Sequence, residues 1–122
     1  MSQIKDYIRE HEGHFLEDLF ELIRIPSVSA KSEHKPDMQR AAEYWQSHLK
    51  KIGVQHAEIF QTPGNPIVFG HYQKDPSLPT LLVYGHYDVM PPEPLDLWKS
   101  EPFEPEVRDG HIWARGADDD KG

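Results

Sequence analysis

The chain has 122 residues, a length that suits a single domain with a modest hydrophobic core. Its 13 basic and 21 acidic residues give a formal net charge of −8, which disfavours binding to nucleic acid and to anionic membranes. The chain has no cysteine, which excludes disulfides, thiolate metal sites and thiol nucleophiles, so a metal site here must use imidazole and carboxylate groups. The charged N-terminus lacks the apolar run of a signal peptide, and we expect a cytoplasmic protein.

Two helices are predicted in the first half of the chain. Residues 3–25 carry apolar side chains at a helical spacing, which predicts an amphipathic helix that is interrupted or bent near Gly13 and ended by Pro26. A polar loop follows. The second helix is predicted to begin after an N-cap at Asp37 and to stop at Gly53, because glycine readily adopts the left-handed conformation that ends helices.

Strands are predicted in the second half. Val54–Gln61 and Ile67–Tyr72 are separated by a turn rich in proline and glycine. The run Thr80–Tyr84 is typical of a strand buried on both faces of a sheet. A final strand is predicted over Val107–Ala114, with a turn at Asp109-Gly110. This order indicates an α/β architecture, but two helices are too few to cover both faces of a sheet, so the fold looks incomplete.

The first candidate site follows the predicted buried strand. His86 and Asp88 are two residues apart, so they would point to the same face at the carboxyl end of that strand, where open α/β sheets build their sites. Imidazole is the commonest metal ligand, and a neighbouring carboxylate can fix its tautomer. Gly85 would allow close backbone approach. The alternative is a surface His–Asp pair without function, and the position after the strand favours the metal site.

The second candidate site is the acidic run Asp118-Asp119-Asp120 near the C-terminus. Adjacent carboxylates repel one another unless a cation offsets their charge. Alternatives are a solvated acidic tail, a remnant of a protease-cleavage tag or a calcium loop, although the spacing is not that of an EF-hand. Together with the upstream His-x-Asp, however, the run supplies the imidazole and carboxylate donors of a cysteine-free zinc site.

In sequence order, these two segments resemble the pattern of the M20 metallopeptidases. The resemblance rests on the segments Leu22–Ser29, Gly85–Pro91 and Arg115–Gly122 and on the intervening Trp98, Pro102-Phe103 and Asp109-Gly110. The Asp-Asp-Lys-Gly ending and the Asp-Leu-Trp loop are most similar to the dipeptidase branch. One departure is Ala114, where the family commonly has glycine.

The resemblance implies a three-layer α/β fold of the zinc-peptidase type with a mostly parallel central sheet, incomplete in this chain. Residues 1–122 would be the N-terminal portion of the catalytic domain, without the lid and dimerisation domain. It also implies that His86 binds one zinc ion, that Asp88 acts in catalysis by orienting His86, and that Asp119 bridges two zinc ions. A cis peptide bond is expected after Asp119. The complete site would hold two Zn²⁺, with Mn²⁺ or Co²⁺ as alternatives.

The implied activity is metal-dependent hydrolysis of dipeptides or related amides. The general base and the remaining ligands of the family lie downstream of Lys121-Gly122, so we expect this fragment alone to be inactive. The expected partners are a small peptide substrate and, for the full-length protein, a second copy in a homodimer. The alternative is a non-catalytic metal-binding or interaction module that retains only half of the metal site.

Overall fold

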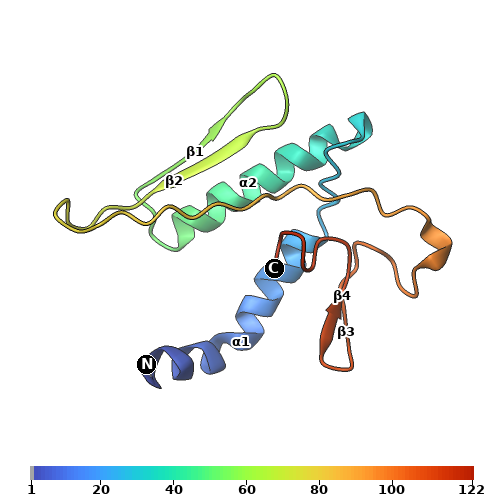
Figure 1. Cartoon of the computed structure of the whole chain (residues 1–122), viewed down its shortest axis with the longest axis horizontal. Coiled ribbons are helices and arrows are strands. Elements are labelled where there is room, and N and C mark those ends of the chain that lie inside the picture. The colour runs from blue at the N-terminus through green and yellow to red at the C-terminus, as the bar shows by residue number, and fades with distance from the viewer. Residues whose placement is uncertain (1) are drawn as a thin grey trace.

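The computed structural model describes residues 2–122 and is elongated rather than layered (Figure 1). Its elements are α1 (Ser2–Ile23), the 3₁₀ turn η1 (Ser32–His34), α2 (Lys35–Lys51), β1 (His56–Phe60), β2 (Ile67–His71), the 3₁₀ turn η2 (Leu95–Leu97), β3 (Glu106–Arg108) and β4 (His111–Trp113). Helix α2 lies against the β1–β2 hairpin, while the C-terminal segment lies beside the end of α1. Residues 72–94, between β2 and η2, form a long extended segment that connects these two groups of elements.

Helix α1 confirms the first predicted helix, but it runs without interruption through Gly13. Its buried residues are confined to its C-terminal end, where Leu22 and Ile23 join Ile25 of the following segment in the core. The apolar side chains nearer its start, including Ile4 and Ile8, are exposed. Within residues 2–122, no helix combines the length and the apolar character needed to cross a membrane.

Helix α2 confirms the second predicted helix and begins three residues earlier than expected. Proline is favoured in a first helical turn, and Pro36 occupies that turn, so Asp37 lies inside the helix instead of capping it. The helix buries Met38, Ala41 and Ala42. Gly53 follows with a φ of 90°, the left-handed stop that the sequence predicts.

Strands β1 and β2 confirm the two predicted strands and the turn between them. They pair antiparallel, and the hairpin packs on α2. Ala57 of β1 is buried, and its partner in the register is Gly70 of β2. A Cβ atom at Gly70 would lie 3.0 Å from Cδ1 of Leu49, so the glycine allows the helix to approach the hairpin closely.

The prediction for residues 107–114 is wrong in its topology, because the segment forms a hairpin instead of a single strand. Strands β3 and β4 pair antiparallel around Asp109 and Gly110, which have φ values of 51° and 75°. Two consecutive positive φ values are the mark of a tight hairpin turn, and aspartate followed by glycine is favoured there. The predicted turn is therefore confirmed, and it reverses the chain.

The predicted buried strand at residues 80–84 is also wrong for this chain. Leu81, Leu82, Val83 and Tyr84 are between 81% and 87% exposed and belong to no strand. The apolar pattern that predicts burial needs neighbouring elements, and the described residues place no strand beside this segment.

A mostly parallel sheet is not confirmed either. The described residues form two antiparallel pairs, and their only parallel contact is an isolated bridge between Val28 and Val89. That bridge nevertheless matters for the site, because it joins the segment after α1 to the segment that carries His86 and Asp88.

Candidate metal centre

The structure brings His86, Asp88 and Asp119 together. Nε2 of His86 lies 3.0 Å from Oδ1 of Asp119, and Nδ1 of the same ring lies 3.2 Å from Oδ1 of Asp88. The side chain of Asp119 is 77% exposed and that of His86 is 41% exposed. The imidazole thus lies between two carboxylates that come from segments about 30 residues apart in the chain.

Both ring nitrogens of His86 face oxygen atoms that accept hydrogen bonds. Nδ1 lies 3.2 Å from the backbone carbonyl oxygen of Asp88, and Nε2 lies 3.0 Å from Oδ1 of Asp119, so each contact favours a hydrogen on its own nitrogen. That carbonyl raises the pKa of His86, and the charges of Asp88, Asp119 and Asp120 act in the same direction, while burial opposes them. When the hydrogen of the neutral ring is on Nδ1, Nε2 keeps the lone pair that a metal ligand needs.

The pair formed by His86 Nε2 and Asp119 Oδ1 fits two ligand positions of a zinc ion. Zinc bonds of about 2.0–2.2 Å at tetrahedral angles place neighbouring ligand atoms roughly 3.3–3.6 Å apart, so the observed 3.0 Å would widen slightly around an ion. Asp88 faces the other ring nitrogen and is not a third donor at that point. Within residues 2–122, no group of three or more His, Asp or Glu side chains is arranged to hold a metal ion.

Asp120 holds the backbone of the His86 segment. Its Oδ2 accepts a hydrogen bond of 3.0 Å from the backbone N–H of His86. A Cβ atom at Gly85 would lie 3.3 Å from that oxygen, so glycine permits this approach. The peptide bond between Asp119 and Asp120 is cis, as the family resemblance implies. Asp118, the third carboxylate of the run, is exposed.

Lys121 anchors the acidic loop to α1. It is 6% exposed, and its ammonium group donates hydrogen bonds of 2.9 Å and 2.7 Å to the backbone carbonyls of Leu22 and Ile25. These carbonyls lie at and just beyond the end of α1, where carbonyl groups lack helical partners. Burial lowers the pKa of Lys121 to about 8. The lysine thus holds the acidic loop against the C-terminal end of α1.

Sequence reasoning did not predict three of the residues whose hydrogen bonds position the candidate site. They are Ser29, Asp120 and Lys121. Ser29 donates from its hydroxyl to Oδ2 of Asp88. Asp120 and Lys121 belong to a run that the sequence already singles out, but neither the spacing nor the residue types indicate which carboxylate turns toward His86.

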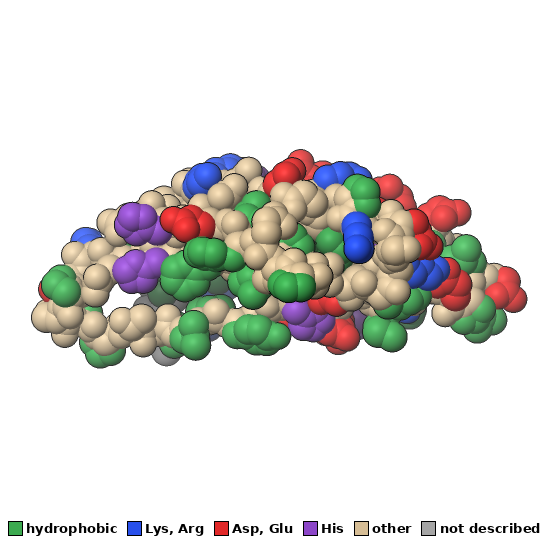
Figure 2. Space-filling model, turned by 90° about the horizontal axis from the view of Figure 1, so that it is seen from above, with side chains coloured by type: hydrophobic (Ala, Val, Ile, Leu, Met, Phe, Trp, Pro, Cys, Tyr) green, Lys and Arg blue, Asp and Glu red, His purple; other side chains and the backbone are tan. Residues whose placement is uncertain are grey.

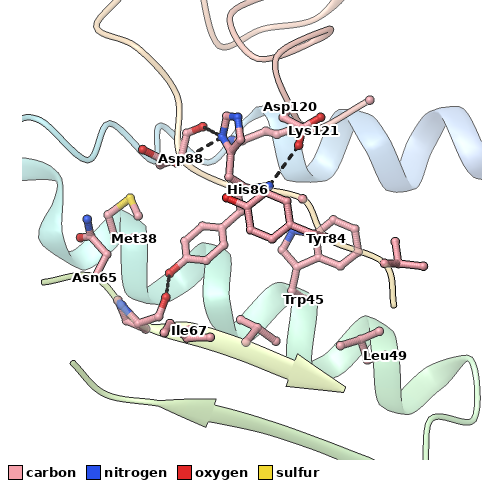
Figure 3. Close-up of a pocket in the computed structure, with 16 residues that line it drawn as sticks. Met38, Trp45, Leu49, Asn65, Ile67, Tyr84, His86, Asp88, Asp120 and Lys121 are labelled. Carbon is pink, nitrogen blue, oxygen red and sulfur yellow. Dashed lines mark hydrogen bonds and ion pairs between the residues drawn. The ribbon is translucent and has the colours of Figure 1, made fainter. Parts of the chain in front are cut away.

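A cavity of about 770 Å³ opens beside the candidate site (Figure 3). Its walls come from α2, from β2 and from the extended segment, which contribute Trp45, Ile67 and Tyr84 respectively. His86 lies at its edge. Tyr87 also lines the cavity, and its hydroxyl donates to the carbonyl of Pro66. The candidate site therefore borders an apolar hollow of a size suited to a small molecule.

The chain is similar in sequence to known metallopeptidases. A sequence model of peptidase family M20/M25/M40 matches residues 82–122, which include all three residues of the candidate site. The Cys-Gly metallodipeptidase DUG1 of Candida albicans is 37% identical over 140 residues, covering all of this chain and 28% of that protein.

Two solved structures resemble this one. The dipeptidase Dug1p of Saccharomyces cerevisiae has a TM-score of 0.85 and 28% identity over 93% of this chain and 26% of its own. The M20 metallo-carboxypeptidase Sso-CP2 of Sulfolobus solfataricus has a TM-score of 0.78 and 36% identity over 87% of this chain and 23% of its own.

The chain spans between 23% and 28% of the length of these relatives. The similarity covers both groups of elements in the structure as well as the segments that carry His86, Asp88 and Asp119. The chain is therefore similar to the M20 peptidase family, with the family model matching its C-terminal third and a relative aligned along all of it.

Proposed function

We propose that this chain contributes part of the metal site of an M20 dipeptidase. The observation that carries the proposal is the pair of donor atoms on His86 and Asp119, which lie 3.0 Å apart, close to ligand spacing. Two of these relatives are named as dipeptidases, which favours a small peptide as substrate. The full-length protein would act on such substrates, and we expect it to be a homodimer.

Each residue has a separate task in this proposal. His86 would supply a neutral nitrogen ligand, and Asp119 a carboxylate that two ions can share. Asp88 would hold the hydrogen of His86 on Nδ1, so that Nε2 keeps its lone pair for the metal. The donor set suits Zn²⁺, with two ions in a complete site, and Mn²⁺ or Co²⁺ are alternatives with the same ligands.

The reaction would be hydrolysis of a peptide or related amide bond. A divalent ion at such a site polarises the carbonyl and makes a bound water more acidic. This chain would contribute orientation and charge: His86 and Asp119 hold their donor atoms at a fixed separation, and Asp120 fixes the backbone of His86. The walls of the neighbouring cavity would receive apolar parts of the substrate.

We infer that residues 80–84 become a buried strand in the full-length protein. The side chains of residues 81–84 are large, hydrophobic and more than four-fifths exposed here, and this chain spans only 26–28% of the length of the DUG1 relatives. In the complete catalytic domain this strand would lie within a three-layer α/β fold with a mostly parallel sheet. The cavity beside His86 would then be narrowed by further elements.

A second candidate function is metal binding without catalysis. It is favoured by the small number of donors, because the residues described here supply two converging ligand atoms where zinc sites normally have three or four from the protein. We therefore expect the 122-residue chain to bind zinc weakly and to hydrolyse no dipeptide. Hydrolysis assays on the full-length protein separate the two candidates.

The proposal is tested by zinc titration calorimetry on this chain and on His86→Ala and Asp119→Ala. Both variants remove a donor atom, and we expect each to weaken binding at least 10-fold. The matched control is Asp118→Ala, which removes the same charge as Asp119→Ala from an exposed neighbour. If Asp118→Ala weakens binding as much as Asp119→Ala, zinc is held by the general charge of the acidic run and the proposed site is wrong.

A further inference from the structure

The carboxylate of Asp88 has two different partners. Its Oδ1 lies 3.2 Å from Nδ1 of His86, and its Oδ2 accepts a hydrogen bond of 2.5 Å from the hydroxyl of Ser29. Ser29 is partly buried and lies 59 residues before Asp88 in the chain. Because a carboxylate rotates about a single bond, a partner on one oxygen also decides where the other oxygen points.

The backbone that carries Ser29 is fixed relative to Asp88. The hydroxyl of Ser27 donates to the carbonyl of Tyr87 at 2.6 Å, and the N–H of Val89 donates to the carbonyl of Ser27 at 2.9 Å. Ser27 and Val28 are fully buried, and Val28 forms the parallel bridge with Val89. Residues 27–29 are therefore hydrogen-bonded to the backbone on both sides of Asp88, at Tyr87 and at Val89.

His86 has two possible neutral tautomers, and a different carboxylate favours each one. A hydrogen on Nδ1 faces both Oδ1 and the backbone carbonyl oxygen of Asp88, whereas a hydrogen on Nε2 would face Oδ1 of Asp119 at 3.0 Å. Only the first tautomer leaves Nε2 free to bind a metal ion. Any group that holds Asp88 in place thus favours the tautomer that can bind metal.

We propose that Ser29 is a positioning residue that acts through Asp88 to keep the hydrogen of His86 on Nδ1. The metal-binding consequence rests on the proposed function above, but the effect on the tautomer does not. The hydroxyl is needed as a donor, because alanine would leave Oδ2 without its partner. Threonine keeps the hydroxyl and adds only a methyl group, so it should substitute for serine.

The experiment is nitrogen NMR of the histidine ring in the labelled chain without metal, at a pH where the ring is neutral. We expect the Nδ1–H tautomer to dominate in the unchanged chain. Ser29→Ala should shift the population toward Nε2–H, and Ser29→Thr should restore it. The matched control Ser32→Ala removes an exposed hydroxyl outside the site and should leave the spectrum unchanged.

A double substitution shows whether Ser29 acts through Asp88. In the Asp88→Ala background, Ser29→Ala should cause no further tautomer shift, since the residue through which it acts is gone. An unchanged tautomer in Ser29→Ala with its amide spectrum intact would overturn the proposal. A full additional shift in the Asp88→Ala background would also overturn it, because Ser29 would then act by another route.

Zinc titration of the same variants distinguishes this proposal from the proposed function. We expect Ser29→Ala to weaken zinc binding about 10-fold, as is typical for removing a group that orients a ligand, and Ser29→Thr to restore it. If the unchanged chain binds no zinc while the tautomer still shifts in Ser29→Ala, the positioning role stands and the metal function is wrong.

Discussion

At the scale of single residues, Gly116 controls how closely the acidic loop approaches the His86 segment. Its φ is 85°, and a Cβ atom there would lie 2.6 Å from Cγ1 of Val89, inside van der Waals contact. Val89 directly follows Asp88 and carries the bridge to Val28. A side chain at position 116 would therefore push apart the two segments that bring Asp88 and Asp119 to the same imidazole.

We predict that Gly116→Ala destabilises the chain more than Gly110→Ala. Both glycines have a positive φ, so both substitutions incur the strain of about 1–2 kcal/mol for a left-handed alanine. Only Gly116 also lacks space for the methyl group, which adds about 1–3 kcal/mol of overpacking. Urea denaturation followed by circular dichroism measures the difference. Equal midpoints for the two variants would show that Val89 moves away freely.

At the scale of elements, Tyr44 joins the two long helices. It lies on α2, and its hydroxyl donates a hydrogen bond of 2.6 Å to the carbonyl of Asp18 on α1. Burial raises the pKa of Tyr44 to about 12, and the negative charges of Asp18 and Glu21 act in the same direction. The neutral phenol is therefore favoured by the folded chain, and the phenolate is disfavoured.

This contact predicts a loss of stability in alkali. The folded pKa of about 12 exceeds the ordinary value of 10.0, so the folded state holds the proton that the unfolded state releases in that window. The contribution of Tyr44 is thus complete below pH 10 and is lost as the pH rises toward 12. Denaturation at several pH values should show a smaller alkaline loss in Tyr44→Phe than in the unchanged chain. The control Tyr72→Phe alters an exposed tyrosine and should not reduce that loss.

The elements that could be predicted from sequence are those that depend on local patterns. Helical spacing defines α1 and α2, Gly53 marks the end of α2, and the turn at Asp109-Gly110 is explained by residue type. The strand at residues 80–84 could not be judged correctly, because its apolar pattern reports what the segment prefers and says nothing about whether neighbours are present.

In the candidate site too, the contacts between sequence neighbours could be predicted, and those between distant residues could not. His86 and Asp88 are neighbours, so their proximity could be predicted, and Asp119 was reached through the family resemblance. The hydrogen bonds of Ser29 and Lys121 join residues 59 and more than 90 positions apart. Such contacts arise only when the whole chain has packed, and no local pattern encodes them.

At the scale of the whole molecule, the extended segment gives the structure a long apolar border. Figure 2 shows hydrophobic side chains along a thin strip of chain, with an opening between the strip and the body. Residues 81–84 account for much of this border, and each is more than four-fifths exposed. An uncovered apolar segment with unpaired backbone groups favours pairing with another chain.

We therefore predict that the 122-residue chain self-associates as its concentration rises. Leu82→Lys places a charge in the middle of the apolar segment and should shift the chain toward the monomer in sedimentation velocity runs. Leu97→Lys is the matched control, since Leu97 is also exposed but lies in η2, away from the segment. A monomer at every concentration, or the same shift in both variants, would contradict this prediction.

The hydrogen bonds from Lys121 to Leu22 and Ile25 have a consequence for the order of events during synthesis. They join residues 99 and 96 positions apart, so the carbonyls at the end of α1 leave the ribosome long before their partner exists. At about 5–20 residues per second, the interval between Ile25 and Lys121 is roughly 5–20 s. Until residue 121 has been made, the carbonyls of Leu22 and Ile25 lack their lysine partner, so the acidic loop can attach to α1 only late in the synthesis of this segment.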